Sequence, residues 1–495
     1  MVALGLVIAQ FNKERPVTHE MAERGREAAA EADAEIVKTI EVPGAYDTPL
    51  AADRLARRDD IDAVAVLGAI VTGDTDHDRV IADAAAQGLT DVSLERDTPV
   101  AFGVTGPGMS VAEADERVDK GAERVEPSAT LAISNLAAEL EADGVDVVDL
   151  SVGEPDFPTP ENVVEAGKDA LDAGHTTYTP SNGIPRLKEA IVDKLDGDGL
   201  DYSTDEIIVT PGGKQALYET FQALVGDGDE VVLLDPAWVS YEAMAKMAGG
   251  DISRVDLSSH GFQLEPVLEE LAETVSDDTE LLVVNSPSNP SGAVFTDAAL
   301  ERVRDLAVEH DVTVISDEIY DAVTYGVEQT SLGSLEGMGD RTVTVNGFSK
   351  AYSMTGWRLG YLAAPEPLVE QAGKLHSHSV SCAANFVQHA GVEALRNTDD
   401  AVAEMREAFR QRRDMLVDLF ADHGTEVPVP DGAFYMMLPV DSDDQAWCEG
   451  AIEEAHVATV PGSAFGTPGY ARLSYAASEQ RLREGVERLA DTGYL

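Results

Sequence analysis

Residues 345–361, VNGFSKAYSMTGWRLGY, hold the two side chains on which the interpretation of this sequence depends. Lys350 follows a strand-like run and a serine, and Arg358 lies among small and aromatic residues. A lysine amine forms an imine with an aldehyde when desolvation keeps part of it neutral. An arginine held nearby suits a phosphate, because its planar guanidinium donates two parallel hydrogen bonds. An aldehyde with a phosphate describes pyridoxal 5'-phosphate (PLP), although a lone Ser-Lys pair is far more often a solvated surface feature.

Two further strand-like stretches end in side chains that suit the ring of this cofactor. Residues 311–320, DVTVISDEIY, end in Asp317 and Tyr320, and residues 281–292, LLVVNSPSNPSG, carry Asn289 in a turn. Ligands of open α/β sheets collect at the carboxyl ends of strands. A carboxylate there keeps the pyridine nitrogen protonated, which makes the ring an electron sink. We therefore expect Asp317 at the pyridine nitrogen, and Tyr320 and Asn289 at the ring phenolate.

Three other stretches suit the phosphate, the flat ring and a substrate carboxylate. Residues 207–217, IIVTPGGKQAL, predict a strand, a Gly-Gly turn and a helix, whose free N–H groups and dipole form a phosphate cradle. Trp238, within DPAWVSY, offers a flat face to the ring. Arg472, within ARLSYA, offers a bidentate clamp for an α-carboxylate.

Taken in order, these stretches resemble the class I aminotransferases, a family of fold-type I PLP enzymes that includes the aspartate aminotransferases. The resemblance runs from about residue 127 to the C-terminus and includes LSVGEPDF, YTPSNGIPRLKEA, NPSG and SDEIY. It implies a large α/β domain over about residues 181–373 and a smaller α+β domain built from about 128–180 and 376–495. It also implies PLP as cofactor, L-amino acids and 2-oxo acids as substrates, and a homodimer.

The resemblance also implies roles for individual residues. Lys350 would carry the cofactor and move the proton between the substrate and the cofactor. Arg472 and the backbone of Gly153 would take the substrate α-carboxylate, while Tyr178 would reach the phosphate of the partner subunit. The residues implied to hold the cofactor within one subunit are Gly213, Lys214, Trp238, Asn289, Asp317, Tyr320, Lys350 and Arg358. Gly347 departs from the family pattern, because many relatives have a serine there that contacts the phosphate.

Substrate choice depends mainly on Lys214, which lies in the predicted phosphate turn. An ammonium there suits a distal carboxylate, with Ser128 and Thr130 nearby in the family layout, and this favours aspartate and glutamate. A surface lysine at the start of a helix is the other interpretation, and aromatic or branched amino acids remain alternatives. PLP-binding regulators of transcription carry a similar domain, but the acidic N-terminal segment here lacks a basic recognition helix.

The charge of the chain limits its partners and its surroundings. Among 495 residues, 92 are acidic and 35 are Lys or Arg, a formal net charge of −57, and the acids are spread along the chain. Nucleic acids and anionic membranes need basic patches, so neither is an expected partner. Such acidity is typical of a high-salt cytoplasm, where salt screens self-repulsion. With no signal peptide or membrane-spanning run, a cytoplasmic protein is expected, and Cys382 and Cys448 are interpreted as ordinary thiols rather than metal ligands.

Residues 1–125 form a separate predicted domain, ahead of an aminotransferase-like domain over residues 126–495. Strand-like runs such as ALGLVIAQFN and AVAVLGAIV alternate with helical stretches such as TPLAADRLARR. Strands that alternate with helices predict a parallel sheet with crossover helices. Four such units fit one small flavodoxin-like, doubly wound layer.

Several turns of this first domain carry candidate functional residues at predicted strand ends. GDTDH (residues 73–77) opens a helix whose N–H groups suit an anion, and His77 suits a proton shuttle near neutral pH. Taken alone, His77 is also compatible with a structural or merely exposed residue. GDTDH, together with FN and VPGAYD, resembles lumazine synthase, which condenses a ribitylaminouracil with a dihydroxybutanone phosphate. The residues implied to bind these substrates are Phe11, Asn12, Ala45, Tyr46, Asp47, Gly73, Asp74, Thr75, Phe102 and Arg117.

In that family layout, Phe11 and Phe102 flank the pyrimidine ring, the phosphate lies on Arg117 and residues 73–75, and residues 45–47 face the ribityl chain. The resemblance stops short of the family's last helix. The chain then passes into the second domain without a Gly/Ser- or Pro-rich linker. The first domain is therefore interpreted either as a working lumazine synthase or as a structural module without catalysis.

Overall fold

The computed structural model describes residues 2–9, 34–58, 60–71, 77–96, 98–109, 129–440 and 443–495, together with six isolated positions between residues 18 and 29. The chain divides into two compact units, Met1–Arg124 and Val125–Leu495. Among the described residues, no helix is both long enough and apolar enough to cross a lipid bilayer.

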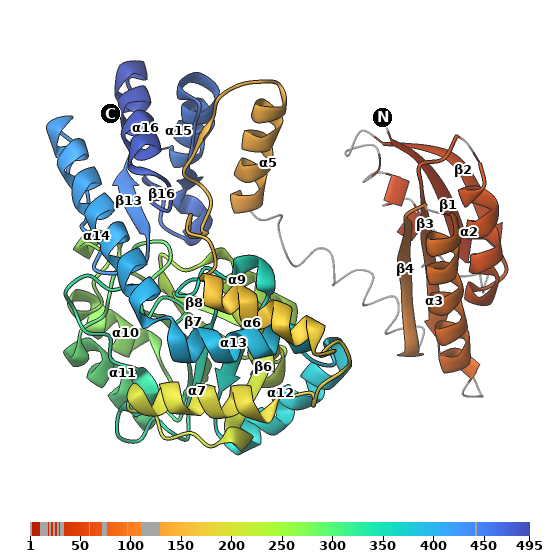
Figure 1. Cartoon of the computed structure of the whole chain (residues 1–495), viewed down its shortest axis with the longest axis horizontal. Coiled ribbons are helices and arrows are strands. Elements are labelled where there is room, and N and C mark those ends of the chain that lie inside the picture. The colour runs from red at the N-terminus through yellow and green to blue at the C-terminus, as the bar shows by residue number, and fades with distance from the viewer. Residues whose placement is uncertain are drawn as a thin grey trace. The chain divides into compact units, whose positions relative to one another are not determined.

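The first unit contains a four-stranded parallel sheet in the order β2-β1-β3-β4 (Figure 1). Its strands are β1 (Val2–Ala9), β2 (Ala34–Val42), β3 (Ala63–Val71) and β4 (Val100–Met109). Helices α2 (Thr48–Ala56) and α3 (His77–Arg96) pack on one face, where Val7, Leu55 and Leu89 share a core. Leu6 and Ile8 alternate to the opposite face. This strand order confirms the flavodoxin-like, doubly wound sheet expected from the sequence.

Helix α3, which the sequence predicts to open at residues 73–77, begins at His77 in the structure and continues through Gly88 to Arg96. A Cβ at Gly88 would lie 2.8 Å from the ring of Pro49 in α2, so glycine lets the two helices approach closely. At the end of α3, the guanidinium of Arg96 donates to the carboxylate of Asp53 in α2 at 2.7 Å. The helix therefore continues for reasons of packing that its local sequence does not reveal.

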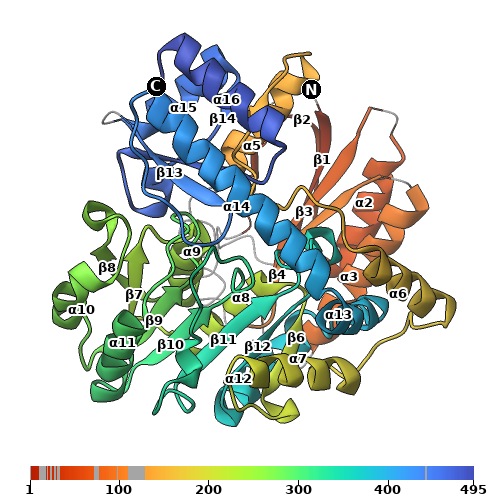
Figure 2. The same cartoon turned by 60° about the vertical axis from the view of Figure 1, so that its left-hand side comes forward.

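The second unit is built on a seven-stranded sheet in the order β6-β12-β11-β10-β9-β7-β8 (Figure 2). β12 (Gly360–Ala363) is antiparallel to both neighbours, and the remaining pairs are parallel. The other strands are β6 (Ile207–Thr210), β7 (Glu230–Asp235), β8 (Asp251–Asp256), β9 (Thr279–Asn285), β10 (Thr313–Asp317) and β11 (Thr342–Gly347). Strands β7 and β9 contain continuous apolar runs, VVLL and LLVV, as expected of parallel strands covered on both faces.

Helices cover both faces of this sheet. Their bounds are α6 (Glu161–Asp172), α7 (Pro185–Gly197), α8 (Gly213–Leu224), α9 (Val239–Ala248), α10 (Leu268–Thr274), α11 (Asp297–Glu309), α12 (Glu366–Ser379) and α13 (Asn385–Asn397). Leu281 and Leu282 of β9 show how the core is divided. Leu281 packs with Leu217 of α8, whereas Leu282 packs on the other face with Val303 of α11.

A smaller antiparallel sheet follows toward the C-terminus. It contains β13 (Tyr435–Pro439), β15 (Val460–Pro461) and β16 (Tyr470–Ser474), with helices α14 (Asp399–Asp422), α15 (Asp444–Gly450) and α16 (Glu479–Thr492) nearby (Figure 2). Helix α5 (Ala129–Ala142) also packs here, because Ile133 and Ala137 share a core with Ile452 and Ala458. After α5, β5 (Val148–Asp149) pairs with β14 (Val457–Ala458). The start of the second unit is therefore held by its C-terminal part.

The carboxyl ends of the central strands meet at one edge of the large sheet. Asp317, the last residue of β10, is in register with Asn285 of β9 and with Val345 of β11. Side chains in the turns after these strands are therefore brought close together, as is usual for ligand sites in open α/β sheets.

Candidate active site

A pocket of about 580 Å³ is lined by residues from this edge of the sheet and from the smaller sheet. The lining residues that were expected from the sequence are Gly153, Gly213, Lys214, Trp238, Asn289, Asp317, Tyr320, Lys350, Arg358 and Arg472. The lining residues that were not expected from the sequence are Glu154, Leu217, Tyr241, Asn285, Ile319, Ser349, Thr355 and Tyr435. The pocket thus combines a few charged groups with apolar and aromatic walls, and its size suits a ligand as large as a cofactor.

Lys350 lies in the turn after β11, and its ammonium is in the pocket. It donates to the backbone carbonyl of Gly153 and lies 5.6 Å from the ring centres of both Tyr320 and Phe434. Burial lowers the pKa of Lys350 to about 8, and the positive charge of Arg472 acts in the same direction. An appreciable part of the amine is therefore neutral near neutral pH, which is the form that attacks an aldehyde.

Asp317 is 4 % exposed at the end of β10. Its Oδ2 accepts a hydrogen bond from the Tyr241 hydroxyl at 2.6 Å, and its Oδ1 accepts one from the backbone N–H of Ile319 at 3.2 Å. Burial raises the pKa of Asp317 to about 6, although both hydrogen bonds lower it. A buried carboxylate of this kind is stabilised by an adjacent cation, such as a protonated ring nitrogen.

An anion site lies where Arg358 meets the N-terminus of α8. Gly212, just before α8, has a φ of +86°, and a Cβ there would lie 2.5 Å from Nη2 of Arg358. Glycine therefore lets the guanidinium lie directly against the helix terminus. Arg358 itself has a φ of +53°, and its Nη1 donates to the carbonyl of Thr355 at 2.9 Å. A guanidinium beside the free N–H groups of a helix suits a phosphate.

Lys214 and Trp238 form another part of the pocket wall. The ammonium of Lys214 lies 4.8 Å from the centre of the Trp238 ring, a distance at which cation and ring attract each other. Burial lowers the pKa of Lys214, and the charge of Arg358 lowers it further. The Trp238 ring meets Tyr241 edge to face at 5.4 Å. A flat face and a second ammonium are thus both present in the pocket.

Arg472, on β16, is only 2 % exposed. Its Nη1 donates to Oδ1 of Asn289 at 3.1 Å, and its Nη2 donates to the backbone carbonyl of Ser151. Its Nε is buried and has no hydrogen-bond partner within the described part of the chain. Aromatic rings of Tyr435 and Phe465 lie 4.8 and 5.2 Å from its guanidinium carbon. The charge of Arg472 is therefore held rigidly, with donor capacity left for a carboxylate.

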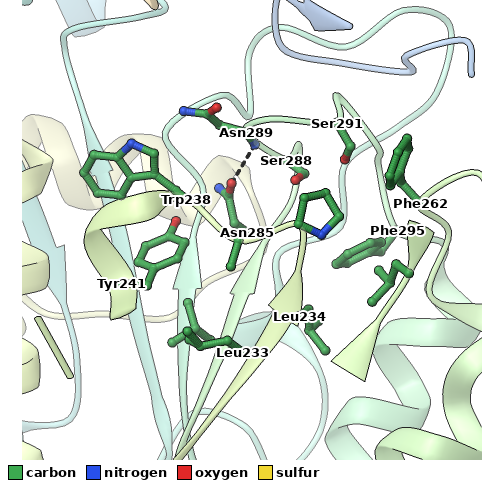
Figure 3. Close-up of a pocket in the computed structure, with 14 residues that line it drawn as sticks. Leu233, Leu234, Trp238, Tyr241, Phe262, Asn285, Ser288, Asn289, Ser291 and Phe295 are labelled. Atoms are coloured by element: carbon green, nitrogen blue, oxygen red, sulfur yellow. Dashed lines mark hydrogen bonds between the residues drawn. The ribbon is translucent and has the colours of Figure 1, made fainter. Parts of the chain in front are cut away.

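Asn289 lies in the turn after β9 (Figure 3). Its backbone N–H donates to Oδ1 of Asn285 at 2.8 Å, and Nδ2 of Asn285 donates to the carbonyl of Asp317 at 2.9 Å. A cavity of about 10 Å³, roughly the room of one water molecule, lies beside these residues and is also lined by Trp238 and Tyr241. The turn after β9 is therefore fixed to the end of β10, so the two walls of the pocket keep their spacing.

These residues fit pyridoxal 5'-phosphate. Lys350 supplies an amine that burial keeps partly neutral, and Asp317 supplies a buried carboxylate for the ring nitrogen. The cradle at Gly212 and Arg358 matches a phosphate, and a side chain at Gly212 would fill it. The chemistry of each donor thus agrees with one group of the cofactor.

Three further positions with expected roles are not among the described lining residues of this pocket, and one of them, Tyr178, was expected at the phosphate of the partner subunit. Tyr178 is 87 % exposed in the loop between α6 and α7, and it does not line the pocket of its own subunit. Asn385 of α13 donates to the carbonyl of Thr177 at 3.0 Å, which fixes this loop. Ser128 and the side chain of Thr130 lie outside the described residues.

In the first unit, the structure describes only part of the candidate site. Ala45–Asp47 form a short 3-10 helix after β2, in which Ala45 is buried and Tyr46 is 63 % exposed. His77 begins α3 and Phe102 lies in β4 opposite Val66, but their side chains lie outside the described part. The other expected residues, which lie wholly outside it, are Phe11, Asn12, Gly73, Asp74, Thr75 and Arg117.

Two protein families match the chain, one for each unit. The sequence model of the class I and II aminotransferases matches residues 145–489. The sequence model of 6,7-dimethyl-8-ribityllumazine synthase matches residues 1–138. The second match extends into α5, yet α5 packs with the aminotransferase part of the structure. The lumazine synthase match therefore ends within a helix that belongs structurally to the second unit, and the aminotransferase match begins after that helix.

Individual relatives agree with the first of these matches. The chain is 44 % identical over 374 residues to an aspartate/prephenate aminotransferase of Thermus thermophilus, covering 74 % of this chain and 96 % of the relative. It is 42 % identical to the structure of the Thermus thermophilus aspartate aminotransferase with maleate, at a TM-score of 0.73, covering 78 % of this chain and 100 % of that one. An aromatic aminotransferase of Pyrococcus horikoshii is 40 % identical, at a TM-score of 0.68 and with 72 % and 98 % coverage.

These matches confirm both resemblances seen in the sequence and the fold-type I architecture of the second unit. The cofactor of this family is PLP, which agrees with the donors in the pocket. The chain belongs to the class I and II aminotransferases, PLP-dependent transaminases, and carries a lumazine synthase domain at its N-terminus.

Proposed function

We propose that this aminotransferase moves amino groups between L-aspartate or L-glutamate and a 2-oxo acid, at the pocket around Lys350. The observation that carries the proposal is the convergence in one pocket of a lysine amine, a buried carboxylate, an anion site and a buried arginine. Relatives named for aspartate and prephenate support acidic substrates. PLP, when bound, supplies the electron sink that stabilises negative charge at the substrate α-carbon.

In this proposal, Lys350 and Asp317 perform the proton chemistry. The neutral amine of Lys350 takes the proton from the substrate α-carbon and delivers it to the cofactor, a role that its lowered pKa of about 8 supports. Asp317 keeps the ring nitrogen protonated, and Trp238 stacks on the ring. Backbone N–H groups at Gly213, with Arg358, hold the phosphate. Asp317 and Arg358 are held by hydrogen bonds within the fold, so in this proposal Lys350 is the side chain that moves to transfer the proton.

The substrate carboxylate is assigned to Arg472 and the backbone of Gly153. Arg472 uses one N–H on Asn289 Oδ1, which leaves the Asn289 amide group to donate to the ring phenolate beside Tyr320. The unpartnered Nε of Arg472 supports a further acceptor at this position. Binding the α-carboxylate here would fix the orientation of the α-carbon relative to the ring, which is the main positional requirement of the reaction.

Lys214 is proposed to select substrates with a second carboxylate. Its ammonium lies in the pocket beside Trp238, where a side-chain carboxylate of aspartate could reach it. Lys214→Ala is therefore expected to lower kcat/KM for aspartate by about 10- to 100-fold, the range for one charge-assisted hydrogen bond. The kcat/KM for phenylalanine should change by less than about threefold, since phenylalanine makes no such bond.

The control for this experiment is Lys374→Ala, which removes an exposed lysine whose amine bonds to Gln371 on the surface of α12. It should leave both substrates unaffected. Equal losses for aspartate and phenylalanine in Lys214→Ala would assign Lys214 to the phosphate rather than to the substrate. An unchanged preference would favour the aromatic or branched-chain alternative, for which the aromatic aminotransferase of Pyrococcus horikoshii is a precedent by name.

A homodimer of the aminotransferase part is also proposed. The side chain of Tyr178 is 87 % exposed, which supports a contact outside its own subunit. The family resemblance implies that this tyrosine contacts the cofactor phosphate bound by the partner subunit. We also propose a domain boundary near residue 125, which the division of the chain into compact units after Arg124 supports, and a large domain over about residues 181–373, which the extent of the seven-stranded sheet supports.

The net charge of −57 supports a working environment of high salt, in a cytoplasm rather than at a nucleic acid or membrane surface. At low ionic strength, repulsion among so many acids opposes compaction. The enzyme is therefore best assayed in molar-range KCl.

A second function is proposed for the first unit, namely lumazine synthesis. The family match over residues 1–138 and the parallel sheet support it, whereas the packing of α5 with the aminotransferase part weighs against a complete synthase. Purified full-length protein in molar-range KCl should form lumazine from the two synthase substrates, with transamination measured alongside as the control. His77→Ala should then reduce lumazine formation by at least about 100-fold while transamination is unchanged.

Transamination without lumazine would contradict this second function. The first unit would then be a structural module without catalysis, and the aminotransferase assignment would be unaffected.

A further inference from the structure

Tyr435 lies where several residues of the proposed site meet, although the sequence analysis assigned no role to it. It is the first residue of β13, it is fully buried, and its side chain lines the pocket. Its hydroxyl oxygen lies 2.7 Å from the hydroxyl oxygen of Tyr320. Its ring faces the guanidinium of Arg472 at 4.8 Å. The residue proposed to contact the ring phenolate and the residue proposed to hold the substrate are thus both in contact with Tyr435.

The backbone of Gly153 also lies close to Tyr435. A Cβ on Gly153 would overlap the Tyr435 hydroxyl, so the phenol lies directly against the Cα of Gly153. The carbonyl of the same glycine accepts the hydrogen bond from Lys350. The contacts with Gly153, Tyr320 and Arg472 hold the Tyr435 side chain in one position at the wall of the pocket.

Two hydroxyl groups that face each other share a single hydrogen bond, so one donates and the other accepts. Within the described residues, neither the Tyr320 hydroxyl nor the Tyr435 hydroxyl makes a second hydrogen bond. If Tyr435 donates, the proton of Tyr320 is free to point at a ligand in the pocket. If Tyr320 donates instead, its proton is used on Tyr435 and cannot serve the cofactor.

The charges around the pair favour donation by Tyr435. Arg472 lies over the Tyr435 ring and withdraws electron density from it, which makes the hydroxyl a stronger donor. Arg472 also acts on Tyr320, but there the negative charge of the nearby Asp317 opposes it, which makes the Tyr320 oxygen the better acceptor of the two. The pair is therefore polarised in one direction, from the arginine toward the carboxylate.

We propose that Tyr435 is a positioning residue that donates to Tyr320 and so directs the Tyr320 proton toward the phenolate oxygen of the cofactor. The inference rests on the proposed contact between Tyr320 and that oxygen. Hydrogen bonds in a chain strengthen one another in a low-dielectric site, so Tyr435 also strengthens the bond that Tyr320 makes.

The test is a double-mutant cycle of Tyr435→Phe, Tyr320→Phe and the double variant, all as PLP-loaded protein. The readout is the pH midpoint of the visible absorption of the lysine-bound cofactor. A donor on the phenolate oxygen favours the deprotonated form, so losing that donor raises the midpoint. Tyr435→Phe is expected to raise the proton affinity by about two- to tenfold, the range for one hydrogen bond, and by less than Tyr320→Phe.

The decisive prediction is that the double variant has the same midpoint as Tyr320→Phe alone, because Tyr435 acts only through Tyr320. The charged groups that face the pair are Asp317 on β10, Lys350 after β11, Arg472 on β16 and Glu154 in the loop after β5, and every variant retains them. The cycle therefore isolates the contribution of the hydroxyl.

Tyr475→Phe is the matched control, since the fully buried Tyr475 hydroxyl donates to Tyr325 at 3.4 Å and lies outside the pocket. It should cost similar stability and leave the midpoint unchanged. If Tyr435→Phe left the midpoint unchanged while Tyr320→Phe raised it, the role of Tyr435 would be overturned and the role of Tyr320 would stand. The same conclusion would follow if Tyr435→Phe shifted the midpoint equally in the wild-type protein and in the Tyr320→Phe variant. An unchanged midpoint in Tyr320→Phe would overturn the proposed role of Tyr320 as well.

Discussion

Lys350→Ala is expected to reduce transamination between aspartate and 2-oxoglutarate by at least about a thousandfold, which combines the loss of a general base with the loss of the covalent anchor. Lys350 lies in the pocket with a pKa lowered to about 8, so its neutral amine is available near neutral pH. Alanine supplies neither an amine for the cofactor nor a base for the α-carbon. The measurement is oxaloacetate formation in a coupled assay, in molar-range KCl with added PLP.

The Lys374→Ala variant serves as the control here too, and it should keep full activity because it alters only the surface of α12. The visible absorption of the bound cofactor should change in Lys350→Ala and remain in the control. A near-normal rate in Lys350→Ala would contradict the assignment of the site.

Asp317→Asn is expected to lower kcat by about 100-fold or more, since an amide cannot keep the ring nitrogen protonated and the electron sink is weakened. The same change should stabilise the cofactor-free protein. Burial raises the pKa of Asp317 from 3.8 to about 6, so folding favours the protonated form. The stability that protonated Asp317 contributes to the folded state is present below pH 3.8 and is lost as the pH rises through 6. The free energy of unfolding therefore falls by at most about 3 kcal/mol over this range.

Asparagine removes that cost, so urea unfolding of the cofactor-free variant at pH 7 should show a higher midpoint than the parent, and the difference should vanish near pH 3. Asp193→Asn is the control, because Asp193 is exposed and pairs only loosely with Arg396 at 3.4 Å. If Asp317→Asn kept near-normal turnover, or if it destabilised the cofactor-free protein at pH 7, the pocket would have been misinterpreted.

The main elements of the site could be predicted because each stands in a short stretch with its own local signal. Lys350, Asp317 and Asn289 follow apolar strands, and the Gly-Gly turn before α8 is a local feature. The carboxyl ends of parallel strands meet at one edge of the sheet, so residues that follow different strands in the sequence lie close together in the structure. The structure brings these residues into one pocket for that reason.

Residues that act through distant contacts could not be predicted in the same way. Tyr241 reaches Asp317 across 76 positions of sequence, and Tyr435 reaches Tyr320 across 115. Neither tyrosine has a local signal that separates it from a core aromatic residue. Such pairs depend on the relative position of two elements, which periodicity and turn residues do not give.

The fold shows the same limit. In the second unit, where the sequence predicted only a large α/β domain, β12 has four residues and runs antiparallel between β6 and β11. A strand this short carries too little pattern to show its direction. Helix α5 is a second example, because it is matched by the lumazine synthase family up to residue 138 but is packed against Ile452 and Ala458.

Whether Lys350 carries the cofactor can be measured by chemical trapping. Borohydride reduces the linkage between a lysine and an aldehyde to a stable amine, and peptide mass mapping then locates the modified residue. The wild-type protein loaded with PLP and reduced in molar-range KCl should carry the pyridoxyl group on Lys350. A pyridoxyl group on another lysine, such as Lys214, or the absence of any stable label would contradict the account.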